Sequence, residues 1–320
     1  MPAARSTAAG PAVLGPALPA PAAVWSLWTR PMRAGGRRSG WATERDHLLS
    51  WILSVESGRR HFGRTRLVAD GPGAELLVDG LGLAFDEVTL ELDALEGVDP
   101  DLWALGKLHA YRAQSAPFLH IDSDVYLWDA PALDWPGAGL FAAYPEFVGY
   151  GASGYRCASL RADIHAAGGW LPEELDAYMP HGGVLRAENC GVLGGSCPGF
   201  VAHYVDQAMR MLEHPANQPV WARRRPLTTD MLIFEQHLLS ACLDYHRNRP
   251  GSPFAGIGVS YLFGSEAEAF ESGGRAGFTH VIADTKHHPE VRARLAARVE
   301  REHPDLFRRC LALCPREEAA

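Results

Sequence analysis

The chain has 320 residues, of which 47% are hydrophobic, which is enough for one large α/β domain or two small ones with a substantial core. Its net charge of −8 argues against a general attraction to nucleic acid, so we expect no nucleic-acid partner. No apolar run reaches the roughly 20 residues that a membrane helix needs, which predicts a chain without a membrane span.

The N-terminal segment has a biased composition. Residues 1–22 are rich in Ala and Pro, and we predict a disordered tail there. Its prolines at positions 11, 16, 19 and 21 would interrupt the apolar part of a signal peptide. We therefore expect a cytoplasmic protein.

Strands and helices alternate after this tail. The apolar residues of 43–58 recur near a period of 3.6, which is typical of a helix with one buried face. Alternation at a spacing of roughly 20–30 residues predicts a largely parallel sheet covered by crossover helices. The elements predicted in this half are strands at 23–28, 65–69, 86–90 and 117–122 and helices at 43–58, 74–79 and 102–114.

The second half of the chain is less regular. Residues 137–187 are rich in Gly, Tyr, Pro and His, and this segment could hold an acceptor-binding insertion, while 254–278 resembles a long loop. The elements predicted here are strands at 188–195 and 279–283 and helices at 199–213, 231–246, 289–302 and 304–314. We expect one domain over 23–286, with 287–320 forming C-terminal helices that pack on it. Neither GxGxxG after the first strand nor GxxxxGK[ST] occurs, which disfavours a standard dinucleotide fold and a P-loop NTPase.

The six cysteines show no pairing pattern. Their spacing matches no zinc signature, and their density is far below that of a disulfide scaffold. We expect reduced and mostly buried thiols.

The segment PFLHIDSDVYLW (117–128) carries the clearest chemical signal. An apolar run ends in Asp122 and Asp124, which are separated by Ser123. Side chains alternate along an extended strand, so both carboxylates would face the same point while Ser123 faces away. Open α/β sheets bind ligands at the carboxyl ends of their strands, and two carboxylates there suit a hard divalent cation. The alternative is a polar turn whose aspartates bind local backbone groups.

Three motifs together resemble the GT-A class of nucleotide-sugar glycosyltransferases. They are HIDSDVYLW with its DxD pair, ENCGVLGG (188–195), and HVIADTK (280–286), which is similar to the HxxGxxK motif of glycogenin-type retaining enzymes. The sequence departs from that motif at Ala283, which replaces its glycine, and at His287-His288, which replace its usual Pro-Trp. The resemblance implies a single GT-A-like, Rossmann-like α/β domain with a mostly parallel central sheet flanked by helices.

The resemblance also implies roles for particular residues. His280 would be a third metal ligand beside Asp122 and Asp124, and this set suits Mn²⁺ somewhat better than Mg²⁺. The residues expected to bind the donor are Lys286 and Lys107 at the diphosphate, Asn189 at sugar hydroxyls, and Gly194 and Gly195, which would let the backbone approach the sugar.

The function that follows is a metal-dependent glycosyltransferase. It would move a sugar from a nucleotide-diphosphate donor, with a UDP-sugar favoured, to an acceptor that the sequence does not identify. The motif at His280 favours retention of anomeric configuration, whereas inversion would require a carboxylate base, for which Glu146 and Glu235 are the candidates. The alternatives are a nucleotidyltransferase on a similar fold and a catalytically inactive member that binds a sugar or a protein partner.

Overall fold

A seven-stranded sheet forms the centre of the molecule. The computed structural model describes residues 20–35, 39–131, 139–150 and 155–314, so most of the predicted tail lies outside the described residues. The strand order is β10-β6-β9-β4-β1-β2-β3, and every strand is parallel to the others except β9. The strands are β1 (Ala22–Leu27), β2 (Thr65–Ala69), β3 (Glu87–Thr89), β4 (Phe118–Ile121), β6 (Leu140–Ala142), β9 (Val192–Gly195) and β10 (Val259–Tyr261). The predicted α/β class and mostly parallel sheet are confirmed.

Side chains of the central strands alternate between two separate cores. In β1, Trp25 is fully buried in the core on one face of the sheet, and Val24 belongs to the core on the opposite face. Trp25 also donates a hydrogen bond to Ser54 of the covering helix at 3.0 Å, which satisfies its buried indole N–H. Burial on both faces explains why β1 has a near-continuous apolar sequence.

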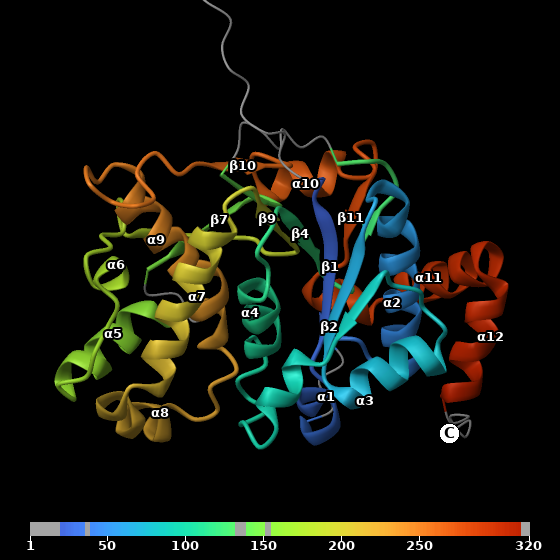
Figure 1. Cartoon of the computed structure of the whole chain (residues 1–320), viewed down its shortest axis with the longest axis horizontal. Coiled ribbons are helices and arrows are strands. Elements are labelled where there is room, and N and C mark those ends of the chain that lie inside the picture. Colours follow the sequence, from blue (N-terminus) through green and yellow to red (C-terminus); the bar gives the residue numbers. More distant parts are fainter. Residues whose placement is uncertain (1–19, 36–38, 132–138, 151–154, 315–320) are drawn as a thin grey trace, which may run out of the picture.

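Two helical layers cover the sheet (Figure 1). On one side α2 (Glu44–Gly58) packs against α11 (Pro289–Glu302) and α12 (Pro304–Leu313). On the other side α4 (Leu105–Arg112) packs against α7 (Pro198–Glu213), which in turn contacts α9 (Leu238–Arg247). The C-terminal helices therefore complete the layer that α2 begins.

Two small antiparallel ribbons lie outside the central sheet. The first pairs β5 (Val125–Leu127) with β11 (Phe278–His280), and the second pairs β7 (Pro145–Gly149) with β8 (Val184–Glu188). The remaining helices are α1 (Arg30–Gly35), α3 (Gly71–Ala74), α5 (Cys157–Ala166), α6 (Glu173–Asp176), α8 (Gln218–Arg224) and α10 (Glu266–Ser272). Short 3₁₀-helical turns lie at Arg59–His61, Glu91–Leu95, Pro215–Asn217 and Ala283–His287. Wider π-helical turns lie at Glu75–Gly80 and Ile233–His237.

Several predicted boundaries were wrong. The strand expected at 188–195 is two strands, because the chain turns between β8 and β9 and only β9 joins the central sheet. The segments 137–187 and 254–278 also contribute sheet strands, β6 and β10, although each is only three residues long. Within the described ranges, none of the helices combines the length and apolar character needed to cross a bilayer.

Candidate functional site

The two aspartates follow β4 on a tight turn. Strand β4 ends at Ile121, and the backbone N–H of Val125 donates to the carbonyl of Asp122 at 3.0 Å, which closes the turn. The expected extended geometry is therefore wrong, yet Asp122, Asp124 and His280 each offer a ligand atom, all within 4.8 Å of one another. The turn brings the carboxylates together at the carboxyl edge of the sheet.

Helix α2 holds this turn in place through two hydrogen bonds. The hydroxyl of Ser54 donates to the carbonyl of Asp122 at 2.8 Å, and that of Ser50 donates to the carbonyl of Ser123 at 2.6 Å. The bond from Ser50 gives the carbonyl of Ser123 a partner inside the protein, and the bond from Ser54 adds a second donor to the carbonyl of Asp122, which also accepts from Val125. The position of the carboxylates is thus determined by a rigid helix rather than by the loop alone.

His280 reaches the aspartates through the β5–β11 ribbon. The antiparallel register pairs His280 with Val125, directly after the turn, although the two residues are far apart in the sequence. His280 Nε2 lies 3.5 Å from Asp124 Oδ1. Asp124 Oδ1 and His280 Nδ1 are buried and have no hydrogen-bond partner within the described parts of the chain. Buried polar atoms normally have partners, so these two atoms are exceptions to the usual pattern.

Lys107 joins Asp122 to a second buried carboxylate. Its Nζ donates to Asp122 Oδ2 at 2.7 Å and to the carbonyl of Cys190 at 3.0 Å, and it also contacts Glu235. Burial alone would lower the pKa of Lys107, but Asp122 and Glu235 outweigh that effect and raise it above its usual value. Lys107 therefore remains a cation inside the site.

Lys286 is the corresponding cation for Asp124. It lies in the turn Ala283–His287, and its Nζ contacts Asp124 and the carbonyl of Ser39. Ala283, which stands where the related motif has glycine, has a φ of 46°. The chain thus adopts the left-handed conformation that favours glycine without having one there.

The two aspartates differ in their electrostatic surroundings. Burial, together with repulsion from Asp124 and Glu235, raises the pKa of Asp122 to about 7 against the opposing effect of Lys107. Burial acts in the same direction on Asp124, but Lys286 and His280 outweigh it and hold the pKa of Asp124 well below its usual range. A neighbouring histidine, His120, is kept neutral because burial and Lys107 both lower its pKa.

Asn189 and Glu146 belong to a second polar group next to the aspartates. Asn189 Nδ2 donates to Glu146 Oε1 at 2.7 Å and to the hydroxyl of Tyr144 at 3.1 Å. The hydroxyl of Tyr155 donates to Glu146 Oε2 at 2.9 Å and contacts the side-chain oxygen of Gln236. Sequence reasoning missed both tyrosines, since neither stands in a recognisable motif.

The structure places the two predicted carboxylate bases differently. Glu235 is 2% exposed and contacts Lys107, which also binds Asp122, so the carboxylate of Glu235 lies inside the protein beside this pair. Glu146 is half-buried and bonds to Asn189 and Tyr155, which leaves it at the surface side of the site. Of the two, Glu146 is the one that solvent can reach.

The paired glycines lie at the opposite end of the strand from the aspartates. Gly194 pairs with Leu119 and Gly195 with Phe118, so both are at the start of β4, whereas the aspartates follow its end. A Cβ on Gly194 would lie 1.9 Å from the carbonyl oxygen of Phe118, which means that strand packing alone requires glycine there. Their expected place beside a donor sugar is not supported.

Gly191 is the glycine that borders the site. A Cβ at this position would lie 2.5 Å from His280 Cε1, and its N–H donates to Asn189 Oδ1 at 3.1 Å. Its carbonyl also accepts from the N–H of Asp122 at 2.9 Å. It stands in the same ENCGVLGG motif as the paired glycines, so the sequence signal was present, although the prediction named Gly194 and Gly195 rather than Gly191.

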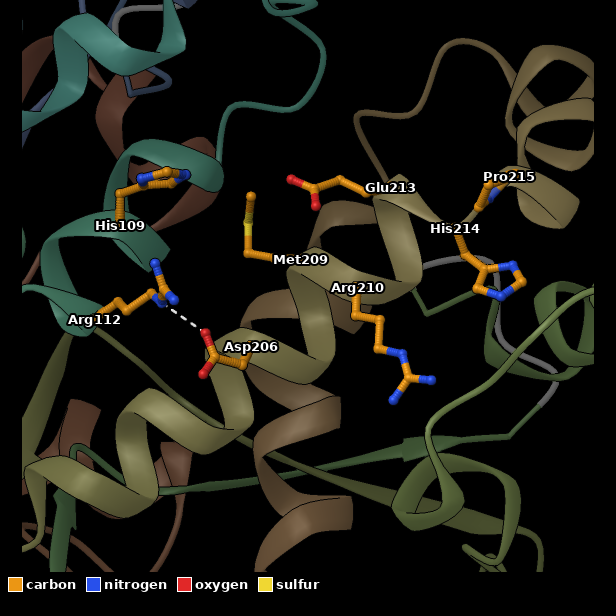
Figure 2. Close-up of a pocket in the computed structure, with 8 residues that line it drawn as sticks. All are labelled: His109, Arg112, Asp206, Met209, Arg210, Glu213, His214 and Pro215. Atoms are coloured by element: carbon orange, nitrogen blue, oxygen red, sulfur yellow. Dashed lines mark hydrogen bonds and ion pairs between the residues drawn. The ribbon is translucent and has the colours of Figure 1, made fainter.

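A separate hollow of about 460 Å³ opens between α4 and α7 (Figure 2). Arg112 and Asp206 form an ion pair across it at 2.6 Å, and both side chains are more than half exposed. The guanidinium of Arg210 stacks over the ring of Trp170 at 4.1 Å. The charged groups of this hollow are mixed in sign and largely solvated. They do not point at one buried position, as the side chains around Asp122 and Asp124 do. The lining residues are His109, Arg112, Asp206, Met209, Arg210, Glu213, His214 and Pro215.

Comparison with known proteins places the chain in a family. A model of a family of unknown function, DUF6734, matches residues 22–313. The chain belongs to this family, whose match begins at β1 and ends in α12. No curated protein matches the chain.

Proposed function

We propose that the protein is a metal-dependent glycosyltransferase that uses a nucleotide-diphosphate sugar as donor. The observation that carries this proposal is the convergence of Asp122, Asp124 and His280 at the carboxyl edge of the sheet, with Lys107 and Lys286 beside them. A carboxylate pair with an adjacent imidazole and two ammonium groups suits a divalent cation and an anionic ligand together. The sheet is compatible with the GT-A-like fold that the sequence motifs imply.

The side chains of Asp122, Asp124 and His280 have the chemistry of cation ligands. Two carboxylates and an imidazole suit Mn²⁺, and Asp124 Oδ1 and His280 Nδ1 are already buried without partners in the described residues. When bound, the cation would neutralise the donor diphosphate and act as a Lewis acid on the leaving group.

The chain's own residues would position and neutralise the donor. Lys286 and Lys107 carry the positive charge that a diphosphate requires, and both are held within reach of the aspartates. Asn189 is fixed by Glu146 and Tyr144, so its amide is oriented before any sugar hydroxyl arrives. We propose a UDP-sugar as the donor to be tested first.

Glu146 and Glu235 would then have different roles. Glu235 balances the charge of Lys107 from a buried position and acts as a positioning residue. Glu146 is the better candidate to contact an acceptor hydroxyl, because it is half-buried and bonded to Tyr155. We propose retention of configuration. A base at Glu146 would instead indicate inversion, and Glu146→Gln would then lower kcat by about 10²–10⁴-fold.

The test is thermal stability with Mn²⁺ and each of UDP, GDP, CDP and dTDP. A nucleotide at about 100 times its Kd should stabilise the chain by about 2.7 kcal/mol, or roughly 5 °C in Tm. We expect this shift to require Mn²⁺ and to disappear in Asp124→Asn. The matched control is Asp129→Asn, which makes the same change after β5 on an exposed residue and should keep the shift.

The outcomes separate the proposal from its alternatives. A Mn²⁺-dependent shift with one diphosphate, followed by cleavage of the matching donor into that nucleoside diphosphate and a sugar, which water accepts when no other acceptor is present, supports a glycosyltransferase. A shift with a nucleoside triphosphate and release of pyrophosphate would indicate a nucleotidyltransferase. Binding without turnover of any donor would indicate an inactive member, and no Mn²⁺-dependent shift at all would overturn the proposal.

A further inference from the structure

A second cluster of potential metal ligands lies in the helical layer formed by α6, α7 and α9. Glu174 stands on α6 and His203 on α7, while Cys242 and His246 are four residues apart on one face of α9. Glu174, His203 and Cys242 each offer a ligand atom within 4.8 Å of the other two. None of these residues contributes to the site around Asp122. The cluster is therefore a separate feature of the fold.

The distances among three of these side chains, Glu174, His203 and His246, resemble those of a coordination shell. Glu174 Oε1 lies 2.8 Å from His203 Nε2 and 3.2 Å from His246 Nε2, and the two Nε2 atoms are 3.2 Å apart. Ligand atoms on a tetrahedral zinc ion lie roughly 3.3 Å apart when zinc–nitrogen distances are about 2.0 Å. The three atoms are therefore spaced as the ligands of one cation would be.

The surroundings of His246 hold its ring in a ligating orientation. Its Nδ1 lies 2.8 Å from the hydroxyl oxygen of Ser252, which also accepts from the N–H of Phe254 at 3.0 Å. A ring that donates from Nδ1 to this oxygen leaves the Nε2 lone pair directed at Glu174. The rings of Phe200 and Phe254 pack against the imidazole and shield it from water. Such an apolar surrounding is typical of structural metal sites.

We propose that Glu174, His203, Cys242 and His246 bind a structural Zn²⁺ ion. Zinc accepts thiolate, imidazole and carboxylate ligands in a closed four-coordinate site, and this set offers all three types. The ion would connect the four-residue helix α6 to α7 and α9. Sequence spacing does not reveal the site, because its ligands come from three helices and include only one cysteine.

The first experiment measures metal content in the full chain, purified from zinc-supplemented cells without chelator. We expect about one zinc per chain in the wild type and in Asp124→Asn, and much less in His203→Ala. A chelator that removes the metal should lower the Tm of the wild type and of Asp124→Asn alike. If the purified wild type contains no zinc, or if chelation leaves its Tm unchanged, the proposal is overturned. Either result holds even if His203→Ala fails to fold.

Replacement of zinc by Co²⁺ tests the thiolate ligand directly. A Cys242–cobalt bond should give a thiolate-to-metal charge-transfer absorption in the near ultraviolet, together with the visible bands of tetrahedral cobalt. We expect the near-ultraviolet absorption to be lost in Cys242→Ser and kept in Cys197→Ser, whose cysteine precedes α7 and is not in the cluster. Cobalt binding without that absorption in the wild type would overturn the assignment of Cys242.

Discussion

Ala283 offers the sharpest test of the turn that carries Lys286. Its φ of 46° lies in the left-handed region, and its side chain is exposed, so its methyl group buries little surface. An L-residue in this region costs about 1–2 kcal/mol relative to the right-handed conformation. Glycine has no such penalty, and Ala283→Gly should therefore stabilise the folded chain.

The size of the effect is the difference between two terms. Glycine gains the about 1–2 kcal/mol of removed strain but gives the unfolded chain extra conformational entropy, worth about 0.4–1 kcal/mol. The free energy of unfolding should thus rise by about 0.5–1 kcal/mol. For a chain of this length, that corresponds to a rise in Tm of about 1–2 °C.

Denaturant unfolding of the wild type, Ala283→Gly and Ala297→Gly measures this difference. Ala297 is an exposed residue inside α11, where glycine should cost about 1 kcal/mol because the helical backbone favours alanine. The two identical substitutions should therefore change stability in opposite directions. If Ala283→Gly destabilises the chain as Ala297→Gly does, the left-handed turn at Ala283 is refuted.

Three other substitutions test the sheet, the buried charges and the acid stability. Gly194→Ala should lower the free energy of unfolding by about 3 kcal/mol or more, because its Cβ would lie 1.9 Å from the Phe118 carbonyl oxygen. Lys107→Met should cost about 3–5 kcal/mol in the same assay, because it leaves buried carboxylates without a cation. The pKa of buried His237, whose Nδ1 lies 2.8 Å from the Arg186 carbonyl, is lowered to about 4 by burial. The unfolded chain therefore binds a proton that the folded chain does not, and stability should fall by about 3 kcal/mol as pH drops from about 6.5 to about 4. Urea unfolding midpoints measured from about pH 6.5 to about pH 4 should show this loss in the wild type, and His237→Gln should lack it.

Each of these predictions has a result that contradicts it. Gly199→Ala in the first turn of α7, where a Cβ would meet no atom within 4 Å, should be neutral or stabilising, and an equal loss at Gly194 and Gly199 would rule out the clash. Full stability of Lys107→Met would mean that its carboxylate partners do not depend on that charge. An unchanged pH profile in His237→Gln would assign the acid sensitivity to other groups.

The sequence predicted long periodic elements better than short ones. The helix expected at 43–58 is α2, and the helix expected at 289–302 is α11, because each is long enough to show an apolar face. Strands β6 and β10 have three residues each, too few for a periodic signal, so only their pairing within the sheet defines them. Local pattern is informative only where an element is long enough to repeat it.

The candidate site was predictable where a motif carried its residues. Asp122, Asp124 and His280 do come together, although the turn after β4 replaces the extended segment that the alternation argument assumed. The contact between Lys107 and Glu235 joins residues far apart in the chain, and no local pattern connects them. Such contacts depend on how α4 and the wide helical turn Ile233–His237 pack, which is a property of the whole fold.

The pairing of each aspartate with a lysine would link the binding of the two proposed ligands. Lys107 and Lys286 serve as built-in counter-ions that keep the aspartates neutralised while the site is at rest. If a divalent cation takes over the aspartates, both ammonium groups become available to an incoming anion such as a diphosphate. Cation and nucleotide would then each tighten the binding of the other by the same factor, since such coupling is reciprocal. The cation would then bind strongly only when the nucleotide is present, and the nucleotide only when the cation is present.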